Sequence, residues 1–268
     1  MSTNLADKWV LITGASSGIG AAAAHAFATE RCRLLLGARR VAKLEAVAAA
    51  AREAGAPTAL YHELDVSQTA SVETFAAWAR QQILDASPGS TAARLDVLIN
   101  NAGGAHGLDP VATAKDADWE AMLQSNVLGL LRVTRACLPM LVANSGSMIL
   151  NLGSVAGRTA YEGGAAYCAA KSGELSITRA LRLELNGTGV RIGTLDPGMA
   201  ETEFSLVRFK GDASRAAKVY EGVQPLCAID IAEALVWMAS RPPHVNIDEM
   251  VIKPTDQAEV YKVHRRKT

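Results

Sequence analysis

The stretch "VLITGASSGIG", Val10 to Gly20, decides the fold. A short apolar run leads into three glycines, Gly14, Gly18 and Gly20, and a helix-favouring, alanine-rich segment follows from 19 to 31. Glycines allow a tight turn and a close backbone approach, and the start of the following helix offers free N–H groups to a pyrophosphate. The spacing is G-x-x-x-G-x-G rather than the commoner G-x-G-x-x-G. A plain strand-to-helix turn is the alternative, but the position after the first strand favours nucleotide binding.

Around this stretch, strand-like runs alternate with helical segments. The strand-like runs are continuously apolar, which is typical of strands buried on both faces of a parallel sheet between helix layers. We therefore predict an α/β fold in one domain over residues 1–268. Strands are expected within 8–13, 33–37, 56–66, 94–104, 147–154, 189–198 and 246–254, and helices within 19–31, 41–54, 68–86, 116–143 (one helix or two), 161–186 and 229–240.

Composition excludes several classes of protein. The formal net charge of zero gives no footprint for nucleic acid or an acidic membrane surface. The start "MSTNLADKW" lacks the apolar run of a secretory signal, and no stretch approaches about 20 apolar residues, so we expect a cytoplasmic protein. The four cysteines form no CxxC pair and the five histidines form no spaced metal pair. We therefore expect reduced thiols and no metal site.

The end of the second strand-like run indicates which nicotinamide cofactor is bound. An NAD-preferring protein usually has an acid there for the ribose 2′-hydroxyl. Here Ala38 is followed by Arg39 and Arg40, and a guanidinium can hold a 2′-phosphate through two hydrogen bonds. We predict NADP, with Arg39 as the stronger candidate and Arg40 as a second candidate or a surface residue. The alternative is that both arginines are merely solvated at a helix start.

Tyr167 and Lys171 lie four residues apart, on one face of an expected helix. An ammonium beside a phenol, whose pKa is ordinarily about 10, favours the phenolate and lowers that pKa. Tyr167 can then exchange a proton with a substrate oxygen, and Ser154, at a strand end, can hydrogen-bond the same oxygen. Tyr161 is a rival without a lysine four residues later, so we expect it in the wall of a substrate pocket. An ordinary helical pair is the alternative for Tyr167 and Lys171.

Six motifs in order along the chain resemble the short-chain dehydrogenase/reductase family. They are "TGASSGIG" (13–20), "NNAG" (100–103), "SNV" (125–127), Ser154, "YCAAK" (167–171) and "DPG" (196–198). The resemblance implies a single-domain, Rossmann-type, doubly wound sheet of seven mainly parallel strands, and hydride transfer to or from a nicotinamide. It also implies a homotetramer.

The same resemblance assigns further site residues. Asn126 would support a water beside Lys171, and Lys171 would also hold the nicotinamide ribose. The implied cofactor contacts are the turn residues Ser16, Ser17 and Ile19, the adenine contacts Asp65 and Val66, the ribose-side residues Asn101, Ala102 and Gly103, and the carboxamide-side residues Pro197, Gly198 and Thr202.

The segment "ETEFSLVRFKGD" (201–212) resembles the branch of NADP-dependent 3-hydroxy acid dehydrogenases, which act on serine and allo-threonine. In that branch residues 199–226 would cover the substrate and 254–268 would form the tail. A substrate carboxylate would need a local cation, and Arg158, Arg208 and Lys210 are candidates; for Arg158 a structural salt bridge is an equal alternative. Glu162 departs from the branch near the pocket mouth and leaves the substrate open.

Three other functions remain at this stage. A broad ketone, sugar or acyl-thioester reductase would share the same site. A redox-sensing protein could bind the nucleotide without chemistry, although such proteins usually lose the tyrosine or the lysine. A structural interaction module would need neither the glycine turn nor Arg39.

Overall fold

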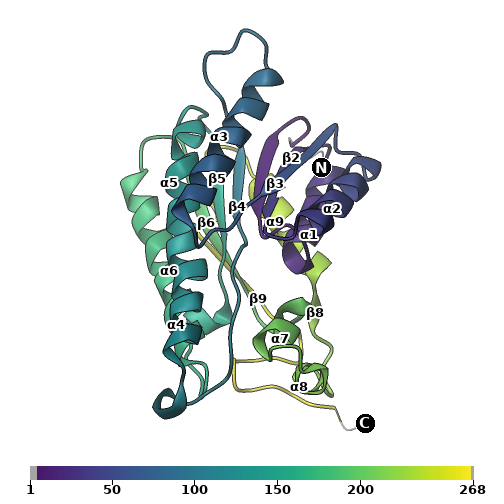
Figure 1. The fold of residues 1–268 in the computed structure, drawn as a ribbon, viewed down its shortest axis with the longest axis vertical. Coiled ribbons are helices and arrows are strands. Elements are labelled where there is room, and N and C mark those ends of the chain that lie inside the picture. Colours follow the sequence, from purple (N-terminus) through teal and green to yellow (C-terminus); the bar gives the residue numbers. More distant parts are fainter. Residues whose placement is uncertain (1–4, 267–268) are drawn as a thin grey trace.

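A seven-stranded sheet forms the centre of the protein (Figure 1). The structure, a computed structural model, describes residues 5–266. The strands follow the order β3-β2-β1-β4-β5-β6-β9, and all six pairings are parallel. This confirms the predicted doubly wound sheet. The strands are β1 (Trp9–Thr13), β2 (Arg33–Ala38), β3 (Thr58–Glu63), β4 (Val97–Asn100), β5 (Met148–Leu152), β6 (Arg191–Pro197) and β9 (Glu249–Ile252).

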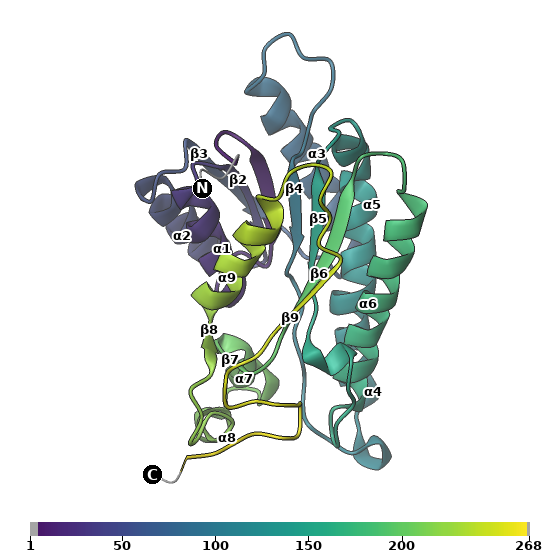
Figure 2. The same ribbon diagram turned by 180° about the vertical axis from the view of Figure 1, so that it is seen from behind.

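Helices cover both faces of this sheet (Figures 1 and 2). One face carries α1 (Gly18–Thr29), α2 (Val41–Glu53) and α9 (Ala228–Ala239). The other carries α3 (Thr69–Asp85), α6 (Ala165–Glu184) and a long composite helix built from α4 (Asp116–Met122), the π-helical η2 (Leu123–Leu128) and α5 (Gly129–Val142). Short 3₁₀ turns, η1 (Val111–Thr113) and η3 (Val155–Gly157), complete this half.

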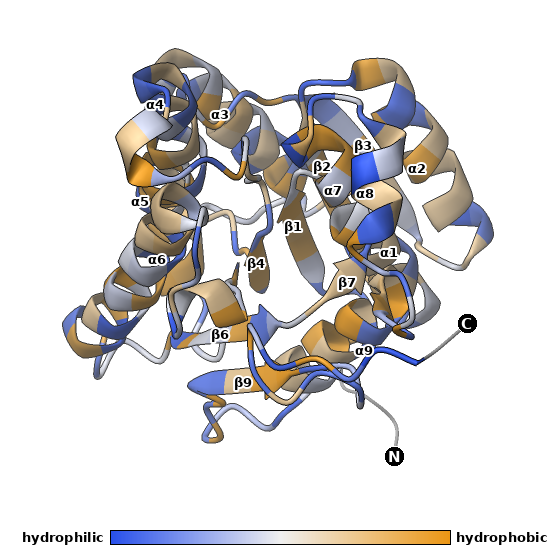
Figure 3. Ribbon diagram, turned by 90° about the horizontal axis from the view of Figure 1, so that it is seen from below, coloured by the Kyte–Doolittle hydropathy of each residue, from blue (hydrophilic) through white to orange (hydrophobic). Residues whose placement is uncertain are grey.

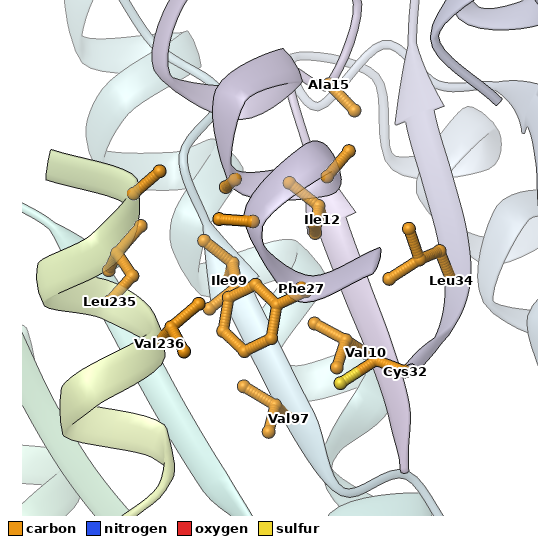
Figure 4. Close-up of a cluster of buried hydrophobic side chains, with 14 of the residues drawn as sticks. Val10, Ile12, Ala15, Phe27, Cys32, Leu34, Val97, Ile99, Leu235 and Val236 are labelled. Carbon is orange, nitrogen blue, oxygen red and sulfur yellow. The ribbon is translucent and has the colours of Figure 1, made fainter. Parts of the chain in front are cut away.

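Two apolar cores lie between the sheet and its helix layers. Successive side chains of a strand point to opposite faces, so Val10 and Ile12 enter the core under α1 and α9, while Leu11 enters the core under α3 and α5. Figure 4 shows Phe27 of α1 wedged between the sheet and Val236 of α9. Burial on both faces explains why the strands read as continuous apolar runs.

A separate region follows β6 at the carboxyl ends of the strands. It contains β7 (Ala200–Glu201), α7 (Glu203–Arg208), α8 (Ala213–Lys218) and β8 (Leu226–Cys227), and β7 pairs with β8. Viewed from below, α7 and α8 lie on the side of α1 and α2, with α4, α5 and α6 across from them (Figure 3). The segment 199–226 was expected, but its two short helices were not.

The C-terminal tail is bound to this region rather than free in solvent. The Arg266 amide donates to the Gly222 carbonyl over 2.8 Å, and Arg265 Nη2 donates to the Val219 carbonyl over 3.2 Å. Residues 267–268 of the predicted tail lie outside the described residues.

The composite helix Asp116–Val142 contradicts the prediction that no stretch of the sequence is long and apolar enough to span a membrane. By length and composition alone it is apolar enough to cross a membrane, although we expected no such stretch. In the structure it packs on α3 and α6 and contributes Val133, Cys137 and Leu141 to the core. Core helices of folded domains pass the same test, so this one is weak evidence for a membrane.

Candidate active site

A cavity of about 1560 Å³ opens at the carboxyl ends of the strands. It lies where the chain order in the sheet reverses, between β1 and β4, which is the usual ligand position in open α/β sheets. Of the site residues predicted from the sequence, Gly20, Asn126, Arg158 and Lys210 do not line it. Those that do are Gly14, Ser16, Ser17, Gly18, Ile19, Arg39, Arg40, Asp65, Val66, Asn101, Ala102, Gly103, Ser154, Tyr161, Tyr167, Lys171, Pro197, Gly198, Thr202 and Arg208.

The glycine turn after β1 has the shape of a phosphate cradle. Gly14 has a positive φ of 66°, and a Cβ there would lie 2.8 Å from Asn101 Nδ2 and 2.9 Å from the Ala102 Cα. A Cβ on Gly20 would collide with the Gly14 carbonyl, so Gly20 lets α1 pack against the turn without lining the cavity. Ser17 makes no side-chain cap on α1, which leaves the first N–H groups of a 12-residue helix free for an anion. These residues fit a dinucleotide pyrophosphate.

The two arginines after β2 differ in their contacts. Arg40 donates from Nε to Ser16 Oγ over 3.2 Å and from Nη1 to Glu203 Oε2 over 2.9 Å, and it also bonds Ser17 Oγ. The Arg39 side chain is exposed and, within residues 5–266, makes no hydrogen bond or ion pair. Arg39 is therefore open to an incoming anion, whereas Arg40 already links the glycine turn to α7.

Ser154, Tyr167 and Lys171 meet at the far end of the cavity. Ser154 follows β5 and accepts a hydrogen bond from the Ala156 amide over 3.1 Å, and it lies close enough to the Tyr167 phenol to lower the pKa of that group. Tyr167 and Lys171 project from the same face of α6, with Lys171 Nζ 5.9 Å from the centre of the Tyr167 ring. The Lys171 ammonium also donates to the Leu152 carbonyl over 2.9 Å. Strand β5 and helix α6 thus bring together the groups that the sequence separates by 17 residues.

The net effect on Tyr167 is opposite to the sequence prediction. Burial raises the pKa of the Tyr167 phenol above its usual value, and Glu174 raises it further. Lys171, Ser154 and Arg208 each lower that pKa, as expected for cations and a hydrogen-bond donor, but they do not offset the burial. The prediction used only the spacing of Tyr167 and Lys171. It did not include the desolvation of the phenol or the charge of the Glu174 carboxylate.

Glu174 is the residue that the sequence reasoning missed. It lies one turn beyond Lys171 on α6, is 3% exposed, and accepts from Lys171 Nζ at both carboxylate oxygens, over 3.0 and 2.9 Å. Burial raises its pKa to about 7, although Lys171 lowers it. The available signal was the spacing: 167, 171 and 174 are i, i+4 and i+7 on one helix face.

Arg208 from α7 lies beside the reactive phenol. Its Cζ is 5.8 Å from the centre of the Tyr167 ring and 5.5 Å from that of Tyr161, and its Nε donates to the Gly107 carbonyl over 3.0 Å. Lys210, the other candidate on this segment, is bound to Asp118 over 3.0 Å and does not line the cavity. The anion-binding candidate in the cavity is therefore Arg208.

Arg158 is wrong as a substrate residue. Its Nη2 lies 2.6 Å from Asp196 Oδ2 and 2.7 Å from Glu249 Oε2, outside the cavity lining. Asp196 is 1% exposed, and a carboxylate that is so buried needs a counter-charge. The structural salt bridge is thus the role of Arg158. Glu162 is exposed and likewise does not line the cavity.

Asn126 lies in the π-helical turn η2 and is fully buried. Its Nδ2 donates to the Met122 carbonyl over 2.7 Å and to the Gly104 carbonyl over 3.0 Å, and its Oδ1 accepts from the Gly104 amide over 3.1 Å. The side chain therefore braces the turn after β4 against the composite helix, just behind the cavity wall.

A model of the family described as "short chain dehydrogenase" matches residues 8–212. This chain is a short-chain dehydrogenase. The matched region contains the glycine turn, Ser154, Tyr167 and Lys171, and the family membership makes the protein an oxidoreductase.

Named relatives of this short-chain dehydrogenase cover nearly its whole length. An NADP-dependent 3-hydroxy acid dehydrogenase of Schizosaccharomyces pombe is 39% identical over 98% of this chain and 99% of its own. Sulfoacetaldehyde reductase 2 of Chromohalobacter salexigens is 41% identical over 93% of this chain and 95% of its own. A solved structure, the closed form of a serine dehydrogenase complexed with NADP⁺, has a TM-score of 0.83 at 35% identity and covers 96% of this chain and 100% of its own.

Proposed function

We propose that this chain is an NADP-dependent dehydrogenase for small 3-hydroxy acids such as serine or allo-threonine, working as one cytoplasmic catalytic domain. The observation that carries the proposal is the position of Arg208, a cation over the ring of Tyr167 in the cavity that also holds Ser154 and Lys171. An acid–base group and an anion-binding group then face one small substrate.

The residues of the chain divide the chemistry among them. When bound, a nicotinamide supplies the acceptor or donor for the hydride on the substrate carbon. In the oxidation direction the Tyr167 oxygen takes the proton of the substrate hydroxyl, and in the reduction direction it returns that proton. Ser154 Oγ hydrogen-bonds the same substrate oxygen. Lys171 stabilises the phenolate form of Tyr167 by its positive charge.

The preference for NADP is supported by the end of β2. Ala38 occupies the position where an acidic residue would hold a free 2′-hydroxyl, and the guanidinium of Arg39 is accessible to a phosphate. The names of the S. pombe relative and of the serine dehydrogenase structure agree with this cofactor. The pyrophosphate would lie on the glycine turn and the free N–H groups of α1.

The preference for an acid is supported by the donors that Arg208 retains. The guanidinium has five N–H donors, of which Nε–H goes to the Gly107 carbonyl. The two terminal NH₂ groups can form the paired hydrogen bonds that a carboxylate accepts.

A second candidate is a reductase for short aldehydes that carry a sulfonate. The relative named sulfoacetaldehyde reductase 2, at 41% identity, supports it, and Arg208 would serve a sulfonate as well as a carboxylate. A broad reductase for neutral ketones is the further alternative, and it would have no use for Arg208 as an anion-binding group.

The test is a substrate panel with NADP⁺ or NADPH. It compares serine, allo-threonine and a simple 3-hydroxy acid with their methyl esters and neutral alcohol analogues, and it includes sulfoacetaldehyde. We expect kcat/KM to favour the acids, and Arg208→Ala to remove about one to two decades of that preference, the equivalent of a charged hydrogen bond of roughly 1.5–3 kcal/mol. Lys210→Ala is the matched control, since Lys210 is on the same segment but faces Asp118.

Tyr167→Phe checks the chemistry separately: turnover should vanish while NADPH binding, followed by its fluorescence, remains. Equal values of kcat/KM for the acids and their neutral analogues would overturn the acid-dehydrogenase proposal and support the broad reductase. A preference for sulfoacetaldehyde over every hydroxy acid would favour the second candidate. Near-native rates in Tyr167→Phe would overturn the assignment of the acid–base group.

A further inference from the structure

Glu174 is a buried carboxyl in direct contact with the proposed catalytic lysine. It is 3% exposed and Lys171 is 7% exposed, and the ammonium lies within 3.0 Å of both carboxylate oxygens. The family mechanism described above uses Lys171 and Tyr167 but gives Glu174 no role. A buried ionisable group costs free energy unless it is paired, so its position beside the lysine calls for an explanation.

The contacts of Lys171 use all of its donors. An ammonium has three N–H bonds, and here they have three acceptors, namely the two oxygens of Glu174 and the carbonyl of Leu152 at 2.9 Å. The position of the positive charge is therefore fixed from one side by a negative charge at about 3 Å. Tyr167, from the other side, experiences an ammonium whose field is partly cancelled.

The other charges around Glu174 are few. Asp196 of β6 is the second charged group that acts on it, and Asp196 is itself paired with Arg158. Among the described residues, α4, η2 and η3, the other elements packed on α6, add no charged group that acts on this carboxyl. Lys171 is thus the main electrostatic partner of Glu174.

We propose that Glu174 is a positioning residue that sets the pH range in which Tyr167 exchanges its proton, by fixing the Lys171 ammonium and cancelling part of its charge. The proposal rests on the function proposed above, in which Tyr167 is the acid–base group. Glu174 raises the pKa of Tyr167 while Lys171 lowers it, which is the direction that the geometry requires.

The charge of Glu174 itself changes near neutral pH. Burial raises the pKa of this carboxyl to about 7. Above that pH the carboxylate holds Lys171 and opposes its effect on Tyr167. Below that pH the neutral acid leaves the ammonium field unopposed. The oxidation reaction should therefore have its acid limb above pH 7, where Glu174 is charged.

The experiment is the pH profile of kcat/KM for alcohol oxidation in Glu174→Gln. Glutamine keeps the size of the side chain and one carbonyl acceptor for Lys171 but removes the charge. We expect the acid limb to move to lower pH by about one unit, the size of one screened charge interaction at this range. The rate on that limb should rise about tenfold at a fixed pH. Glu184→Gln is the matched control, because Glu184 is exposed on the same helix.

A second readout does not depend on turnover. For the protein without cofactor, a carboxyl whose folded pKa is raised stabilises the fold below its unfolded pKa of about 4.5, and this stability is lost as the pH rises through about 7. The free energy of unfolding of the parent protein should therefore fall between these pH values relative to that of Glu174→Gln. Glu184→Gln should follow the parent protein.

The outcomes separate this proposal from the proposed function. Coincident profiles of parent and Glu174→Gln, a shift to higher pH, or a parent acid limb below pH 7 would each overturn the role of Glu174. If 3-hydroxy acids do not react, the profile is measured with whichever panel substrate does, so failure of the substrate assignment is seen separately. If Glu174→Gln does not fold, Glu174→Asp decides: it should move the limb in the same direction by less, and an unmoved limb contradicts the proposal.

Discussion

At the residue scale, Arg39 and Arg40 have different tasks although they are neighbours in the sequence. Arg40 is engaged by Ser16, Ser17 and Glu203, whereas the Arg39 guanidinium is exposed at the cavity and without a polar partner among residues 5–266. Arg39→Ala should therefore raise the apparent KM for NADPH about ten- to a hundredfold more than that for NADH, because one charged contact to the 2′-phosphate is lost. Initial-rate kinetics with both cofactors measure this. Arg80→Ala, an exposed arginine on α3 outside the cavity, is the control. An equal loss with both cofactors would reject the role of Arg39.

The site residues that could be predicted from the sequence have one structural feature in common, which is their position just after a strand of the parallel sheet. The glycine turn, the turn of Asn101 to Gly103 and Ser154 each directly follow a strand of a parallel sheet, and parallel strands end at one edge. Once the strands are correctly assigned, these residues are expected to meet at the carboxyl edge of the sheet. Arg158 and Glu174 depend instead on partners or burial that no local pattern encodes: Asp196 is 38 residues beyond Arg158, and the desolvation of Glu174 arises from packing around α6.

At the element scale, the Glu203 carboxylate at the start of α7 forms ion pairs with Arg40 and Lys43 at the start of α2. Glu203 lies 2.9 Å from Lys43 Nζ and 2.9 Å from Arg40 Nη1, and hydrogen bonds from Lys43 and Arg40 lower its pKa to about 2. This negative charge contacts Arg40, the neighbour of Arg39, and lines the same cavity as the guanidinium proposed to hold the 2′-phosphate. Glu203→Gln should strengthen NADPH binding about two- to fivefold at low salt, with a smaller gain at high salt, because the lost repulsion is between exposed charges. It should also speed amide exchange in α7.

Fluorescence titration at two salt concentrations and hydrogen exchange provide these measurements. Glu201→Gln, an exposed neighbour outside the cavity, should change neither. Weaker NADPH binding in Glu203→Gln would show that the carboxylate helps the nucleotide rather than opposing it.

Element length explains what could be predicted at this scale. The seven strands of the main sheet and the helices of 12 or more residues have clear apolar patterns, and all of these were expected near their observed positions. The two-residue strands β7 and β8 were not expected. Helices α7 and α8 have six residues each, too few for a helical period to be read, and no described residue of either but Ser205 is buried. The order of the covering region comes from tertiary contacts, such as those with Gly107 and the tail.

At the scale of the whole molecule, the layer of α4, η2, α5 and α6 leaves large apolar side chains in solvent. Leu131 of α5 is 38% exposed, and Leu183 of α6 is 78% exposed. The composite helix is long and apolar, yet only 44% of its most apolar window is buried within one chain. Burial of such side chains between subunits would contribute about 25 cal/mol for each Å² removed from water.

We therefore keep the prediction of a homotetramer in which these helices pair. Light scattering at micromolar concentration should give a mass near four times the 28.2 kDa of one chain. Leu131→Glu, which places a charge on the outer face of this layer, should reduce that mass while the far-ultraviolet circular dichroism stays unchanged. A parent protein of 28.2 kDa under these conditions would contradict the prediction, and the exposed leucines would then be ordinary surface residues.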